Sequence, residues 1–251
     1  MPEPLYDQDL VIRVALAMSE RGCPVDKSAL EKALVDIARD SENEMDHVLQ
    51  RYRTSYLDPL EERHGRWGYY PQWKFNLERA FWASARPNIQ GIPYKALTGL
   101  MGARVSMVQP YPYLAAKLAG KAGSQWTDVY ENGTDLHAWI AERLGVERKV
   151  ARIAFFDFIS KRDVSNHKTD LVRAFPWLES IPQEKLFTRL TLESANIVRT
   201  TVCQLFVETE QVPTLVLTDF AVGNEAYVKK LKALWEKIGF QVETDLLAGD
   251  A

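Results

Sequence analysis

The sequence of 251 residues has only two cysteines, Cys23 and Cys203, which form neither a disulfide framework nor the paired spacing of a zinc site. It also lacks any apolar run long enough to span a membrane. Its first ten residues, MPEPLYDQDL, are acidic and polar, unlike a secretory signal peptide. We therefore expect a cytoplasmic protein with reduced thiols and no membrane partner.

The chain has no excess of positive charge, with a formal net charge of −3 and a pI of about 5.9. This balance argues against capture of nucleic acid by the whole surface, so any such site must be a local patch. The hydrophobic content of 46% and charged content of 26% are ordinary for a globular protein. The length allows one large domain or two small ones with a sizeable core.

Residues 130–160 predict two consecutive helices. Asp135 can cap the first, whose apolar residues recur at three- and four-residue spacing, and Gly145 ends it. The second starts after Glu147 and carries Arg148, Lys149 and Arg152 close together over one turn. Cations on one face and apolar residues on the other allow such a helix to contact phosphates while packed on a core. The alternative is an ordinary solvated basic face.

Residues 54–99 are rich in aromatic residues, glycine and proline, and Lys74 and Phe75 are expected on a strand. Four polar side chains accompany the aromatic ones: Arg79, Arg86, Asn88 and Gln90. Charge and amide groups beside aromatic rings suit contacts with sugar–phosphate and bases, which makes these residues candidates for nucleic-acid binding. The alternative is a loop whose Asn and Gln satisfy their own backbone.

Several of these segments together resemble family A DNA polymerases. The order GTDLH, then R-x-x-x-R-x-x-x-F at Arg148, Arg152 and Phe156, resembles the fingers region, in which an acidic–His pair precedes the nucleotide-binding helix. The stretch Pro87 to Pro93, PNIQGIP, resembles the N-L-Q-N-I-P motif at the thumb–palm junction. The segment from Leu16 to Leu34 resembles the start of the thumb, and Thr191 to Phe206 resembles a palm helix.

The chain departs from the family where catalysis is expected. Counting back from the helix Leu114 to Gly120 places Ser106 at a metal-binding Asp, Gln109 at the family Gln and Tyr111 at a Glu. No Asp or Glu lies between Gly99 and Lys121. Two-metal phosphoryl transfer needs carboxylates that bridge both cations, and a serine hydroxyl cannot replace that charge. We therefore expect no polymerase activity.

The C-terminal part keeps one of the expected acidic residues. Residues 213–247 predict a strand, a turn, a helix from Glu225 to Ile238 that Gly239 ends, and a strand from Phe240 to Leu246. The resemblance places Asp219 at the family's second metal-binding Asp. Residues 161–190 are expected to be short and irregular, as if most of the fingers were deleted.

The resemblance implies an α+β fold, with an antiparallel palm-type sheet packed with helices and an N-terminal helical thumb-base segment. The predicted domains are a thumb-like segment, 1–60, and a palm-like domain, 61–251, with reduced fingers at 133–165. Within family A the sequence most resembles phage polymerases, and this resemblance implies a location in the cytoplasm of a bacterial host and a role in DNA replication or phage DNA metabolism.

Three functions stay open. The first is a nucleic-acid-binding protein without catalysis, whose partner is duplex or primer–template-like DNA. The second is a DNA-modifying enzyme, such as a base-directed group transferase, with Asp219 and His137 as the catalytic candidates and Asp157 and Ser106 to be tested beside them. The third is a scaffold that binds replication proteins. Mg²⁺, held by Asp219, is expected only if some catalysis remains.

Overall fold

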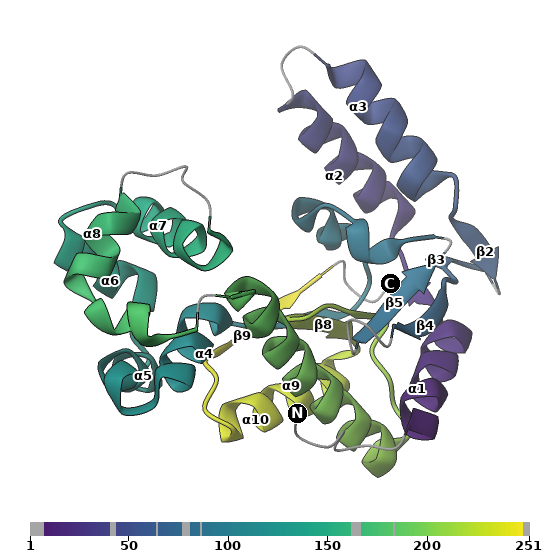
Figure 1. The fold of residues 1–251 in the computed structure, drawn as a ribbon. Helices are drawn as coiled ribbons and strands as arrows, with labels where there is room; N and C mark the ends of the chain where they lie inside the picture. The colour runs from purple at the N-terminus through teal and green to yellow at the C-terminus, as the bar shows by residue number, and fades with distance from the viewer. Residues whose placement is uncertain are drawn as a thin grey trace. The chain divides into compact units, whose positions relative to one another are not determined.

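The computed structural model describes residues 8–40, 44–63, 65–76, 81–85, 87–161, 167–182 and 184–247 (Figure 1). The chain divides into two compact units. Unit 1 comprises Met1–Ser106, Asn196–Leu234 and Glu243–Ala251, and unit 2 comprises Met107–Ala195 and Trp235–Val242. The predicted boundary between a thumb-like and a palm-like segment at residue 60 stays a prediction.

Unit 1 begins with helices and continues with short strands. Its helical elements are α1 (Gln8–Arg21), α2 (Lys27–Arg39), α3 (Met45–Tyr52), the π-helix η1 (Arg53–Leu57) and the 3-10 turns η2 (Ile89–Gly91) and η3 (Tyr94–Gly99). The strands of the fold are β1 (Cys23–Pro24), β2 (Glu61–Arg63), β3 (Arg66–Tyr69), β4 (Gln72–Asn76), β5 (Phe81–Ala85), β6 (Ala103–Met107), β7 (Leu215–Val216), β8 (Phe220–Gly223) and β9 (Val242–Leu246).

The strands form three small sheets, ordered β1-β3-β2, β4-β5 and β7-β8-β6-β9. The pairs β1–β3, β2–β3, β4–β5, β6–β8 and β7–β8 are antiparallel. All five side chains of β6 are buried, as is expected of a strand inside a sheet that is covered by helices. The predicted α+β class with antiparallel sheets is confirmed.

Local sequence signals set the N-terminal helices of unit 1. The apolar stripe of α1 is buried as its spacing predicts, and Gly22, at φ +70°, ends the helix. Asp26 caps α2 by accepting a hydrogen bond from the Ala29 N–H at 3.0 Å. The buried Trp82 of β5 donates its indole N–H to the Val11 carbonyl at 3.0 Å, so the β4–β5 hairpin is joined to α1.

Unit 2 is mainly helical: α4 (Pro110–Ala119), η4 (Gly120–Gly123), α5 (Ser124–Glu131), α6 (Leu136–Leu144), α7 (Arg148–Ser160), α8 (His167–Ala174) and η5 (Pro176–Ser180). Helices α9 (Leu186–Thr209) and α10 (Glu225–Lys237) contain residues of both units. Helices α6, α7 and α8 pack against one another (Figure 1). The fully buried Trp126 contacts the rings of Phe155, Phe175 and Trp177 at centroid distances of 6.0, 5.1 and 4.8 Å.

Two expectations about local structure are wrong in part. The segment 161–190, expected to be irregular, contains α8, η5 and the first turn of α9. Leu171 is the one buried residue of α8, so the helix lacks the apolar periodicity that would have revealed it. The region after residue 213 contains the β7–β8 hairpin rather than a single strand, and β9 starts at Val242 rather than Phe240.

Candidate nucleic-acid interface

The β6–β8 pair brings together Ser106 and Asp219, the two positions that the resemblance assigns to metal-binding carboxylates. Ser106, buried on β6, lies directly opposite Phe220 of β8, and Phe220 follows Asp219. The two positions therefore lie at neighbouring strand ends. Only one of them carries a carboxylate.

The surroundings of Asp219 do not fit a two-metal site. Burial raises the pKa of this half-buried carboxyl, while its own backbone N–H and the cation of Arg104 lower it. Arg104 is buried, forms an ion pair with Asp245, and has its guanidinium carbon 4.5 Å from the centre of the Tyr94 ring. Across the described part of the chain, no group of three or more His, Cys, Asp or Glu side chains could hold a metal ion. One carboxylate beside an arginine supplies too few anionic ligands to hold two divalent cations.

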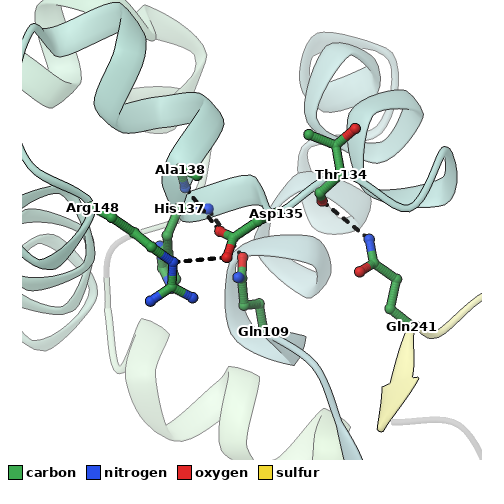
Figure 2. A network of polar contacts seen from close by, with 7 residues as sticks. All are labelled: Gln109, Thr134, Asp135, His137, Ala138, Arg148 and Gln241. Atoms are coloured by element: carbon green, nitrogen blue, oxygen red, sulfur yellow. Dashed lines mark hydrogen bonds and ion pairs between the residues drawn. The ribbon is translucent and has the colours of Figure 1, made fainter.

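A polar network joins the start of α6 to the start of α7 (Figure 2). Asp135 caps α6, with one carboxylate oxygen accepting from the Ala138 N–H at 2.8 Å and the other from Arg148 Nε at 2.7 Å. Gln109 accepts the His137 N–H on its Oε1 at 3.0 Å. The GTDLH motif therefore acts as a helix cap that also orients the first arginine of α7.

Gln109 reaches this network from an unusual backbone conformation. It precedes α4 with φ +47° and ψ +51°, the left-handed region, which non-glycine residues seldom adopt. The predicted helix Leu114–Gly120 thus begins earlier, at Pro110, and Gln109 is its N-cap residue. The resemblance places Gln109 at the family Gln, but its contact with His137 was not predicted from the sequence.

His137 is neutral at physiological pH. The residue is 3% exposed, and its pKa is lowered to about 4. Burial is the largest cause, and the cations of Arg148 and Arg152 also lower the pKa, while the Asp135 carboxylate raises it. Burial raises the pKa of Asp135, but the hydrogen bonds from the Ala138 N–H and from Arg148, together with the Arg148 cation, outweigh burial and hold this pKa below its usual value. Asp135 is therefore an anion that pairs with Arg148, a role that the sequence did not predict beyond capping.

The three cations of α7 form one exposed surface, which we call the α7 cationic face: Arg148, Lys149 and Arg152. The opposite side of the helix buries Ala151, Ala154, Phe155, Phe158 and Ile159. The predicted division of this helix into a charged and an apolar side is confirmed in part, because Ile153 is 40% exposed and the buried side also contains Asp157. Arg148 pairs with Asp135, but its side chain stays exposed like those of Lys149 and Arg152, so all three cations can meet phosphates.

The PNIQGIP segment uses its Gln internally. Gln90 Nε2 donates to the carbonyls of Trp82 at 3.1 Å and Val216 at 2.8 Å, and Oε1 accepts from the Ser84 N–H at 3.0 Å. Its amide thus joins β5 to β7, a structural role that differs from the predicted alternative of a loop whose amides satisfy their own backbone. Asn88 is exposed and pairs with the Ser84 hydroxyl at 3.3 Å. The other two candidates of this segment, Arg79 and Arg86, lie outside the described residues.

Comparison with known proteins places this architecture among polymerase folds. No protein-family model and no curated protein matches the sequence. The fold matches that of a family A polymerase domain: the chain superimposes on the POL domain of Pol1 from M. smegmatis, solved in complex with DNA primer-template and dNTP. The TM-score is 0.69 at 12% sequence identity, over 94% of this chain and 69% of that chain. None of the described helices is long and apolar enough to cross a membrane.

Proposed function

We propose that this protein binds DNA on a polymerase-like scaffold without adding nucleotides to it. The observation that carries the proposal is the α7 cationic face, with Arg148, Lys149 and Arg152 exposed over a buried apolar side. The likeness to a polymerase domain solved with primer-template DNA supports a duplex or primer–template-like ligand. Ser106 in place of a carboxylate argues against two-metal nucleotide transfer.

Binding is tested by fluorescence anisotropy with single-stranded, duplex and primer–template DNA at several salt concentrations. A double variant with Arg148→Ala and Arg152→Ala should bind DNA more weakly. The slope of the logarithm of the binding constant against the logarithm of the salt concentration should become shallower by about one unit for each lost phosphate contact. Lys229→Ala with Lys230→Ala is the matched control, because it removes two exposed cations from α10. An affinity and slope equal to those of the wild type in the α7 variant would overturn the proposal.

The absence of nucleotide transfer is tested separately. Primer extension with Mg²⁺ or Mn²⁺ should give no product, because Asp219 is the only carboxylate that the resemblance leaves at the palm strand ends. Incorporation that is lost in Asp219→Asn would show that the first catalytic motif has been misplaced. Incorporation that persists in this variant would point to a contaminating polymerase.

A DNA-modifying enzyme is the second candidate, and the raised pKa of Asp219 favours it, since acid–base groups in active sites have shifted pKa values. The test is mass spectrometry of nucleosides from the DNA of bacteria that express the protein. A modified base that appears with the wild type and disappears with Asp219→Asn supports this enzyme. Unaltered nucleosides, together with binding to partner proteins, favour a scaffold in replication.

A further inference from the structure

Three aromatic rings from distant parts of the sequence meet in unit 2, and we call them the aromatic platform: Tyr111 of α4, Phe156 of α7 and Phe187 of α9. The centre of the Tyr111 ring lies 6.0 Å from that of Phe156, at an interplanar angle of 80°. It also lies 6.0 Å from the ring of Phe187, at an angle of 41°. These distances are those of contacting aromatic pairs.

The platform is open to solvent and lies beside positive charge. Phe187 is 42% exposed, and Tyr111 and Phe156 are half-buried. The guanidinium carbon of the exposed Arg152 lies 5.8 Å from the centre of the Phe156 ring. A cation over one ring and an exposed ring close by offer the two kinds of contact that a nucleotide needs, one for its flat base and one for its charged phosphate.

The resemblance to family A polymerases places Tyr111 where that pattern has a Glu, so this position brings no carboxylate that would repel a phosphate near Arg152.

We propose that the aromatic platform stacks an unpaired base of a DNA strand whose phosphates contact Arg152 and the rest of the α7 cationic face. This inference rests on the proposed DNA binding and specifies its ligand. A base inside a duplex is already stacked on its neighbours, whereas an unpaired base offers an open face to an aromatic side chain. The platform thus selects single-stranded or overhanging DNA over a blunt duplex.

The test compares a short oligothymidylate with a strand of abasic sites of the same length, which keeps the phosphates and lacks the bases. We expect the wild type to bind the oligothymidylate roughly 5- to 150-fold more tightly than the abasic strand, since stacking contributes roughly 1–3 kcal/mol per base. Phe187→Ala should lose most of this difference, and its affinity for the abasic strand should be unchanged. Because Phe187 is exposed, this variant is expected to fold.

Two control variants sharpen the test. Phe187→Tyr keeps a ring and should bind the oligothymidylate like the wild type. Leu192→Ala removes an exposed apolar side chain, 38% exposed on the same helix, and should change neither affinity. Equal wild-type affinity for the two strands would overturn the stacking inference and leave the proposed DNA binding in place. Failure of the wild type to bind any DNA would overturn both the stacking inference and the proposed DNA binding.

Discussion

His137 is a buried imidazole whose ordinary charge change lies near neutral pH. Its pKa of about 4 in the folded protein lies below the unfolded value of 6.5, so the unfolded chain binds more protons between these pH values. The stability that this neutral ring contributes is complete above about pH 6.5 and is lost as the pH falls toward 4. The pKa of the Asp135 carboxyl lies below its usual 3.8, so its effect comes at a lower pH.

Replacing His137 with Gln should therefore flatten the pH dependence of stability. In the wild type, we expect the free energy of unfolding to fall by up to roughly 3 kcal/mol between pH 6.5 and 4 on account of this group, given about 1.4 kcal/mol for each pH unit. Urea denaturation at several pH values measures the slope. His47→Gln, at an exposed residue, is the control and should keep the wild-type slope. An equally steep slope in His137→Gln would contradict this account.

Gln90 is the second residue whose side chain decides stability. Gln90→Leu leaves the carbonyls of Trp82 and Val216 and the Ser84 N–H without their partner. An unsatisfied buried group costs about 1–3 kcal/mol. Because these three hydrogen bonds are only partly buried, we expect a total loss of roughly 2–4 kcal/mol, seen as a lower urea midpoint. Asn88→Ala, which removes one exposed contact, should cost less than about 1 kcal/mol. Similar midpoints for the two variants would show that the Gln90 bonds do not hold β5 to β7.

At the scale of elements, α2 and η3 approach each other through a glycine. A Cβ added at Gly99 would lie 2.5 Å from both Cα and Cβ of Leu30, which is fully buried on α2. Gly99→Ala should therefore force the two elements apart and cost about 1–3 kcal/mol. We expect the melting temperature to fall by roughly 2–12 °C.

Gly91→Ala is the control for this packing. A Cβ at Gly91 meets the Tyr56 hydroxyl at 3.4 Å, an ordinary contact, so its melting temperature should stay close to that of the wild type. A Gly99→Ala variant as stable as Gly91→Ala would mean that the α2–η3 contact is looser than the structure shows.

The elements that the sequence predicted best have strong local signals. The caps at Asp26 and Asp135 depend on neighbours within a few residues, and the structure confirms them. The two-sided pattern of α7 is confirmed in part, since Ile153 is exposed. Helix α8 was missed because its sequence, HKTDLVRA, is mostly polar and buries only Leu171.

The candidate site was predictable only in part. The cationic residues of α7 follow from their spacing, since one helix presents them all. The aromatic platform combines α4, α7 and α9, and no local pattern shows that rings so far apart in the sequence meet. For Gln90 the sequence offered a nucleic-acid contact or a bond to its own backbone, and neither included its hydrogen bond to Val216, because that partner is distant in the sequence.

At the scale of the whole molecule, a net charge of −3 makes DNA binding depend on where the cations lie. The overall field repels a polyanion, so the α7 cationic face must supply the attraction locally. The affinity for DNA and the slope of its salt dependence should therefore depend on Arg148 and Arg152 rather than on the total charge of the protein.

Ser106 opposite Phe220 on β8 also determines how the fold responds to its ionic surroundings. Two carboxylates at adjacent strand ends repel each other unless a divalent cation lies between them, whereas Asp219 has the cation of Arg104 near it. We expect the same melting temperature in EDTA and in Mg²⁺. Ser106→Asp should introduce the like-charge repulsion and make the melting temperature rise with Mg²⁺. A lower melting temperature of the wild type in EDTA would contradict this expectation. Equal melting temperatures would mean that the folding of this palm does not depend on the supply of divalent ions in the cell.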